Sequence, residues 1–186
     1  MKRFIATCLA TIATLVLLAG GALAAQPGTD SDVEAQFAAA LSDYDIAIQS
    51  KDPRHPGFEK ALAAWRPLVE SGHLGALYHV GLFHYLGVGG AVIDPALGIG
   101  MIRKSAESGY ATAQAFMGLL SDKGDGTAVL RSEENALRWY QQAAAQNQCA
   151  AVKWMINAYS SGYPGLDPSM ARLESLRKGL PDCKRR

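Results

Sequence analysis

The sequence predicts an all-α protein, built as a solenoid of about four antiparallel helical hairpins. One observation behind this prediction is a repeated unit, anchored at Gly72, Gly109 and Asn147, which stand 37 and 38 residues apart. A second is that apolar residues between these anchors recur at helical spacing. A period of this length is typical of stacked helix pairs, each of which buries its apolar face against its neighbours.

The match between the units extends well beyond the anchors. The equivalent positions are Ala61, Gly98 and Ala136 before the anchors, Ala76, Ala113 and Ala151 after them, and Gly81 with Gly118 in the first helices. Small residues at such positions leave room for a neighbouring helix to approach closely. The glycine-rich segments 87–90 and 124–126 are expected to reverse the chain within each hairpin, because glycine adopts turn conformations without strain.

Capping residues and breakers place the individual helices. The first is expected over about 32–49, with Ser31 or Asp30 as its cap and Glu34 completing a capping box. Two prolines end it, and a second helix is expected over about 58–71. The next begins at Leu74 and ends near Leu86, with His84 among its inward residues. The second helices of the three following hairpins are expected to start at Asp94-Pro95, after Ser132 and at Asp167-Pro168. These residues suit the cap and first helical positions.

These elements divide the chain into segments. They are a leader (1–25), a linker (26–30), an irregular N-terminal hairpin (31–73), two repeats (74–110 and 111–148), a terminal repeat (149–179) and a tail (180–186). The leader has a basic start, an apolar run from Phe4 to Leu23 and a small-residue site at Ala22-Leu-Ala24. This pattern predicts a signal peptide cleaved near Ala24 or Ala25, and so a periplasmic or secreted protein. The alternative is a leader retained as a membrane anchor.

Composition narrows the classes of partner. Removing Lys2 and Arg3 from the 18 basic residues leaves 16, against 17 acidic ones. No basic patch suggests nucleic acid, and no second long apolar run suggests a membrane span after cleavage of the leader. We therefore expect a protein or peptide partner, and no cofactor.

The cysteines give a specific structural prediction. The exported chain would retain Cys149 and Cys183, and an even number of cysteines in an oxidising compartment favours a disulfide. Cys149 starts the first helix of the last hairpin and Cys183 lies just past its second helix, so the two ends should be adjacent. The predicted bridge would close a loop of about 34 residues and stabilise the fold by a few kcal/mol. The alternative is two free thiols.

The motif Ala136-Leu-Arg-Trp-Tyr-Gln-Gln-Ala-Ala144, with the preceding Ala and Gly positions and the Gly-x-Gly turn, resembles the Sel-1-like repeat, a relative of the tetratricopeptide repeat. The resemblance covers about residues 58–179 and implies a right-handed α-solenoid. It departs from the family pattern where the first helices usually carry tyrosine. Two of these positions hold His84 and Ser121, whereas the third keeps Tyr159, so we expect looser packing in the middle of the stack.

The resemblance implies a non-enzymatic scaffold, such as an adaptor or an immunity protein, that binds its partner in a concave groove lined by first helices. His79, Phe116 and Trp154 occupy the same repeat position. They are candidates for a ladder of rings along that groove, with Phe83 as a further candidate. The competing interpretation is that these rings seal the interfaces between hairpins, because aromatic residues at helical spacing usually belong to the core.

Catalytic and metal-binding patterns are sparse. Ser175 and Lys178 form a Ser-x-x-Lys motif, which serves as the nucleophile motif of serine β-lactamases and penicillin-binding proteins. The alternative function is therefore a β-lactam or cell-wall-fragment binder or hydrolase at this region. The Ser-Asp-Asn and Lys-Thr-Gly motifs that accompany that chemistry are missing. His79 and His84 form the only close histidine pair, at a spacing unsuited to zinc. We expect no catalytic residue and no metal site.

Overall fold

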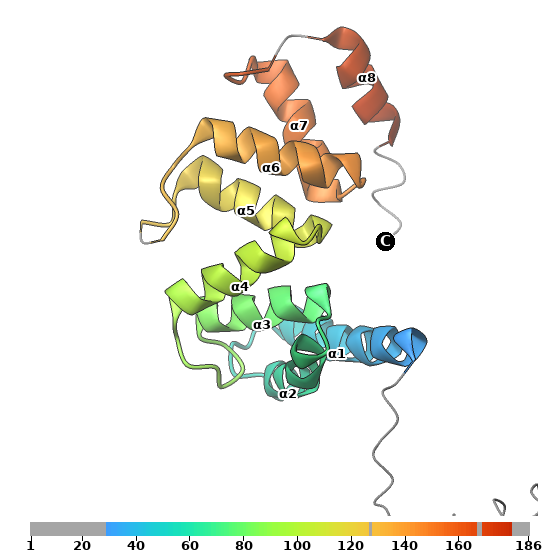
Figure 1. The fold of residues 1–186 in the computed structure, drawn as a ribbon, viewed down its shortest axis with the longest axis vertical. Coiled ribbons are helices and arrows are strands. Elements are labelled where there is room, and N and C mark those ends of the chain that lie inside the picture. The colour runs from blue at the N-terminus through green and yellow to red at the C-terminus, as the bar shows by residue number, and fades with distance from the viewer. Residues whose placement is uncertain (1–28, 127, 167–168, 180–186) are drawn as a thin grey trace, which may run out of the picture.

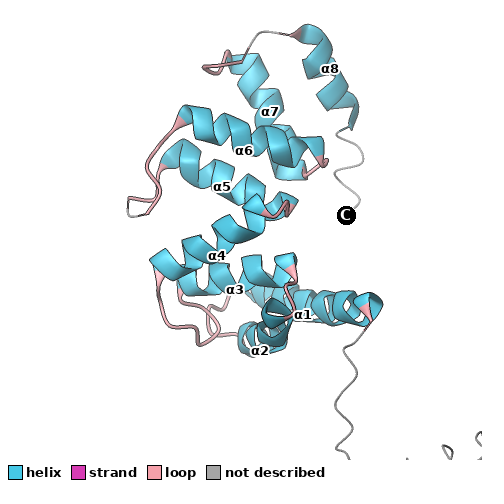
Figure 2. Ribbon diagram, in the orientation of Figure 1, coloured by secondary structure: helices cyan, strands magenta, loops and turns pink. Residues whose placement is uncertain are grey.

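The computed structural model describes residues 29–126, 128–166 and 169–179. Within these ranges the chain forms eight helices and no strand, and Figures 1 and 2 show the helices stacked as hairpins from one end of the molecule to the other. In chain order they are α1 (Asp30–Ser50), α2 (Pro56–Glu70), α3 (Leu74–Leu86), α4 (Pro95–Glu107), α5 (Ala111–Lys123), α6 (Glu133–Ala145), α7 (Cys149–Ser161) and α8 (Met170–Gly179). The predicted all-α solenoid of four hairpins is confirmed.

The three repeat anchors share one backbone conformation. Gly72, Gly109 and Asn147 follow the second helix of their hairpins with φ values of +88°, +101° and +58°. Each donates its N–H to a carbonyl three residues earlier, at 3.0, 3.0 and 2.9 Å. This left-handed turn ends one hairpin and starts the next, and glycine or asparagine adopts it most readily. The period in the sequence is therefore the period of a helix-ending turn.

Within the second hairpin, two glycines let the helices cross closely. A Cβ atom added at Gly98 in α4 would lie 2.6 Å from the carbonyl oxygen of Gly81 in α3. In the next hairpin, a Cβ added at Gly118 in α5 would lie 3.0 Å from the ring of Tyr140 in α6. Missing side chains thus set the distance between paired helices, as the sequence pattern indicated.

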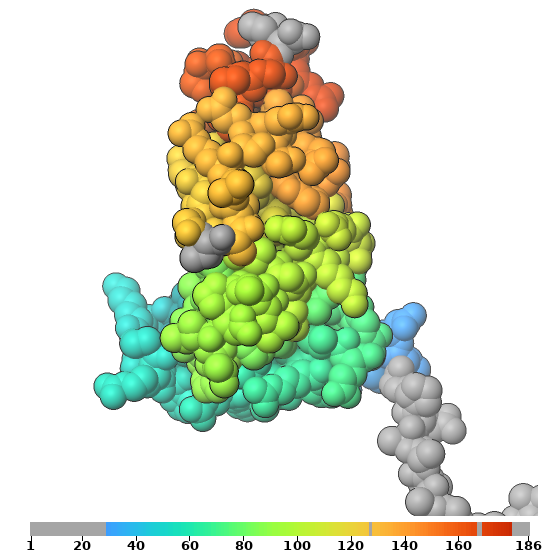
Figure 3. All heavy atoms as spheres, turned by 60° about the vertical axis from the view of Figure 1, so that its left-hand side comes forward, coloured from blue at the N-terminus to red at the C-terminus, as the bar shows by residue number. Residues whose placement is uncertain are grey.

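The described residues form a hydrophobic core of three clusters, and each cluster joins successive hairpins. The first links α1, α2 and α3 around Trp65 and Phe83, both 0% exposed. The second links α3, α4 and α5 around Ile99 and Ile102, and the third links α5, α6 and α7 around Tyr140. Figure 3 shows the described hairpins stacked one on another in chain order. A hairpin in this fold is therefore stabilised by its neighbours as well as by its own pairing.

Helix starts differ from the sequence predictions in two places. Thr29, rather than Ser31 or Asp30, caps α1, and it forms a capping box with Asp32 instead of Glu34. Helix α2 begins at Pro56, because the His55 ring accepts from the backbone N–H of Gly57 and proline suits the first helical turn. The predicted caps Asp94 and Ser132 are observed. Asp167-Pro168 lies outside the described residues.

His84 is less buried than the sequence suggested. Its ring is only partly covered, and its Nδ1 atom lies 3.1 Å from the carbonyl oxygen of Val92 in the turn that follows. The His84 ring thus contacts the loop that leads to α4. His84 therefore helps to fix a turn, and does not fill the core as a family tyrosine would.

Two predictions fall on residues whose structure is not described. Residues 1–25, the predicted leader, lie outside the described ranges, and so does Cys183. Cys149 is the first residue of α7 and is partly buried. Across the described ranges, none of the helices combines the length and the apolar character needed to cross a membrane.

We expect the exported protein, purified without reductant, to react with less than one equivalent of a thiol reagent after denaturation. Oxidation of Cys149 and Cys183 to a disulfide would consume both thiols and would constrain the last hairpin by tying its two ends together. Reductant should expose two reactive thiols and lower the melting temperature. Mass spectrometry of the labelled chain counts the reactive thiols before and after reduction. Two labelled cysteines before reduction would contradict the pairing.

Candidate functional site

The first helices α3, α5 and α7 present a hollow of about 320 Å³ at the centre of the stack. Phe116 and Leu119 of α5 and Trp154 of α7 line it, together with Tyr78 of α3 and Tyr140 of α6. Smaller residues complete the lining: Thr112, Ala115, Gln148 and Ala150. We call this hollow the first-helix groove. It brings together two of the four predicted partner-binding residues, Phe116 and Trp154.

The described lining of the first-helix groove is uncharged at neutral pH. Burial, reinforced by neighbouring acidic or phenolic groups, raises the pKa of Tyr78 and of Tyr140, so both hydroxyls stay protonated. The surface therefore offers aromatic faces, one aliphatic side chain and a few hydrogen-bonding groups. Such a surface suits an apolar segment of a partner, because no fixed charge has to be desolvated on binding.

The rings of Phe116 and Trp154 are held in place by other aromatic side chains. Trp154 stacks on Tyr140 with ring centroids 4.1 Å apart, and Tyr163 meets its edge at 4.7 Å. Phe116 is held edge-on by Tyr78 at 6.0 Å and Tyr85 at 6.1 Å. Both rings remain partly exposed. They therefore belong to the inter-hairpin packing and to the groove surface at the same time.

His79 and Phe83 do not reach this surface. Phe83 is 0% exposed, and His79 is 7% exposed and stacks on Trp65 at 4.4 Å. Side chains of α1 and α2, including Tyr44 at 5.3 Å, cover the position in α3 that Phe116 and Trp154 occupy in later hairpins. Because the N-terminal hairpin closes the groove at α3, the predicted ring ladder ends at Phe116.

Several groove residues were absent from the sequence-based set. Leu119 follows Phe116 by three residues and Ala150 precedes Trp154 by four, so helical periodicity could have found both. Tyr140 lies on α6, a second helix, and no spacing rule indicates that its ring reaches the side of the first helices. Its contribution depends on how α6 packs between α5 and α7.

The Ser-x-x-Lys motif lies on the exposed part of α8. Ser175 and Lys178 are both exposed, and the Lys178 ammonium group pairs with Glu174 at 3.2 Å. This arrangement gives no support to the alternative function as a β-lactam binder or hydrolase. Over the described ranges, no group of three or more histidine, cysteine or acidic side chains is placed to hold a metal ion.

Comparison with known proteins identifies the repeat. The Sel1 repeat family model matches residues 75–110 and 111–148, which contain α3–α4 and α5–α6. No curated protein matches the sequence significantly.

Two solved structures share the fold. One is a Sel1 repeat protein from Oxalobacter formigenes, 22% identical over 86% of this chain, with a TM-score of 0.62. The other is a protective antigen present in uropathogenic Escherichia coli strains that displays an SLR fold, 22% identical over 82% of this chain, with a TM-score of 0.58. The chain spans 61% and 31% of the length of these proteins. Residues 75–148 therefore form two Sel1 repeats, within a solenoid that shares its fold with these solved Sel1-like proteins.

Proposed function

We propose that this protein is an exported, non-enzymatic scaffold that binds an apolar segment of a protein partner in the first-helix groove. The observation that carries the proposal is the uncharged aromatic hollow formed by Phe116, Leu119 and Trp154. Sel1 repeat proteins are typically protein-interaction scaffolds, and a solenoid offers an extended surface to a peptide. The leader pattern in residues 1–25 supports export to the periplasm or beyond.

A charge placed in the groove should abolish partner binding without unfolding the protein. Leu119 is 45% exposed and belongs to none of the three core clusters, so Leu119→Glu leaves the core of the free protein intact. In the complex the new carboxylate would lie against an apolar segment and lose its hydration, which is strongly unfavourable. We expect at least a tenfold drop in the amount of partner captured from a periplasmic extract, measured by quantitative mass spectrometry.

Leu97 provides the matched control. It is 47% exposed and lies on α4, a second helix whose residues do not line the groove. Leu97→Glu introduces the same charge at the same exposure, and capture should stay at the level of the unmodified protein. Equal recovery of every partner by the Leu119→Glu and Leu97→Glu proteins would rule out the first-helix groove as the binding surface.

A further inference from the structure

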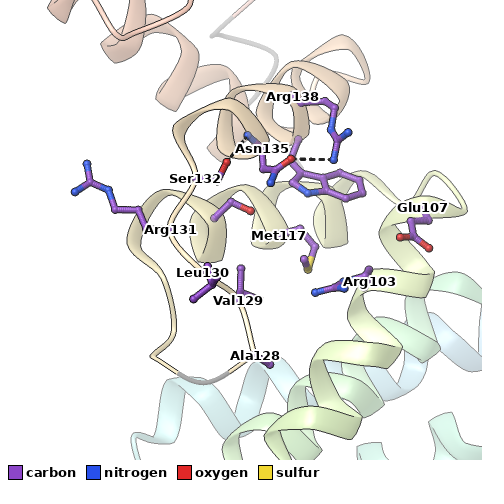
Figure 4. A pocket seen from close by; sticks show the side chains of 12 residues that line it. Arg103, Glu107, Met117, Ala128, Val129, Leu130, Arg131, Ser132, Asn135 and Arg138 are labelled. Carbon is purple, nitrogen blue, oxygen red and sulfur yellow. Dashed lines mark hydrogen bonds between the residues drawn. The ribbon is translucent and has the colours of Figure 1, made fainter.

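A second cleft lies on the other side of α5, between the second helices of neighbouring repeats (Figure 4). Its volume is about 550 Å³. Arg103 and Glu107 of α4 form one wall, Asn135, Arg138 and Trp139 of α6 form the opposite wall, and Met117, Ser121 and the loop residues 128–132 lie between them. We call it the α4–α6 cleft. It shares no lining residue with the first-helix groove.

The cleft exists where the repeat pattern lacks a large side chain. Ser121 occupies the position at which the Sel-1-like pattern usually carries tyrosine, and it lines the cleft. The backbone around it is nonetheless well fixed, because the Ser121 carbonyl oxygen accepts from the N–H of Ser132 at 2.7 Å. The equivalent carbonyl of His84 accepts from Asp94 at 2.9 Å, so both turns are tied down alike. The space therefore results from a small side chain within a regular backbone.

Two guanidinium groups flank this space. Figure 4 shows Arg103 extending toward Met117, whereas Arg131 points away, where it pairs with Glu133 at 3.0 Å. Arg138 hydrogen-bonds to the neutral Asn135 side chain at 3.1 Å and lies 5.6 Å from the centre of the Trp139 ring. Among the described residues, neither Arg103 nor Arg138 forms an ion pair. Their charges are available to a ligand.

Apolar surface lies beside these charges. Met117, Val129 and Trp139 are largely buried at the base of the cleft, and Leu130 at its edge is 88% exposed. Arginine is suited to bidentate hydrogen bonding with a carboxylate, and the adjacent base suits an aliphatic or aromatic side chain. A nucleic acid would need a longer run of basic groups than two arginines with Glu107 nearby.

We propose that the α4–α6 cleft binds an acidic peptide segment of a partner protein, in which a carboxylate stands next to an apolar side chain. The carboxylate is held by Arg103 and Arg138, and the apolar side chain lies on Met117, Val129 and Trp139. This site is independent of the first-helix groove, so one copy of the chain can hold two segments at once. Binding at two sites raises the overall affinity when both segments belong to one partner or assembly.

Peptides selected from a random displayed library against the full protein test this proposal. We expect the enriched peptides to carry Asp or Glu beside Leu, Ile, Val or Phe. A synthetic copy of an enriched peptide should bind at least tenfold more weakly to Arg103→Glu and to Arg138→Glu, measured by fluorescence polarisation. Both arginines are exposed, so these changes leave the core intact. Binding should also weaken with added salt.

Two further variants separate the cleft from the groove. Ser121→Tyr restores the ring of the family pattern and should abolish peptide binding by filling the cleft, with circular dichroism confirming that the helices remain. Leu119→Glu alters only the groove and should leave binding within twofold. The proposal would be overturned if the enriched peptides lacked acidic residues or bound both arginine variants as tightly as the unmodified protein. It would also be overturned if only Leu119→Glu abolished their binding. A library without enrichment would overturn it as well.

Discussion

Replacing Gly98 with alanine is expected to destabilise the protein by about 2–3 kcal/mol. The added Cβ atom would lie 2.6 Å from both the Gly81 carbonyl oxygen and the Tyr85 backbone nitrogen in α3. These are backbone atoms, so the contact cannot be relieved by a side-chain rotation, and α3 and α4 must move apart. The separation would also loosen Ile99 and Ile102, which are 2% and 0% exposed in the second core cluster. The midpoint of urea unfolding, followed by circular dichroism, measures the change.

Gly100 offers a control in the same helix. A Cβ atom added there meets nothing within 4 Å. Gly100→Ala should therefore stabilise the protein by about 0.5–1 kcal/mol, because alanine loses less conformational freedom than glycine on entering a helix. Opposite signs for the two substitutions would establish the close helix crossing. A Gly98→Ala protein as stable as the unmodified chain would refute it.

Acidification is expected to weaken the N-terminal half of the solenoid through His79. The ring lies among Trp65, Tyr44, Tyr78 and Phe37, and its Nδ1 atom is buried without a hydrogen-bond partner in the described residues. Burial, with a smaller effect from the charge of His73, lowers the pKa of His79 from 6.5 to about 4. The neutral ring is therefore the form that the folded protein accommodates.

The sign of the pH dependence follows from this difference. Between pH 6.5 and about 4 the unfolded chain binds a proton at His79 and the folded chain does not. Stability is then lost as pH falls through this window, by up to about 3 kcal/mol in total. Below about pH 4 both states are protonated, and this contribution no longer changes. Unfolding midpoints measured from pH 7.5 to pH 4 should show the decline.

His79→Phe keeps a flat ring for stacking on Trp65 and removes the titrating group. We expect it to match or exceed the stability of the unmodified protein at pH 7 and to flatten most of the decline below pH 6.5. His84→Gln, at the solvent-facing end of the same helix, serves as the control and should keep the decline. If His79→Phe left the acid dependence unchanged, groups other than His79 would be responsible for it.

Much of the fold could be predicted from local rules. The anchors Gly72, Gly109 and Asn147 marked helix-ending turns, and Asp94 and Ser132 marked helix starts, because these signals depend on a few neighbouring residues. Thr29 was missed because several residues in 29–34 can cap, and choosing among them requires the entry angle of the chain. The absence of tyrosine at Ser121 indicated looser packing, and a cleft lies there.

The binding surfaces were harder to predict, because equivalent repeat positions do not have equivalent surroundings. His79, Phe116 and Trp154 share one position in the repeat, but α1 and α2 bury the first and leave the other two at a groove. Likewise, Arg103 and Arg138 are unremarkable in the sequence, since they lie on different helices in different repeats. The stacking of hairpins places them on opposite walls of one cleft.

The sequence by itself determined the helices, their pairing into hairpins and the type of repeat, because periodicity, caps and small residues act over short distances along the chain. The tertiary structure decided which faces remain open. The N-terminal hairpin covers α3, the Tyr140 ring reaches the first-helix side, and a serine in a tyrosine position leaves space between α4 and α6. Each of these outcomes depends on contacts between hairpins that are distant in sequence, which no local pattern encodes.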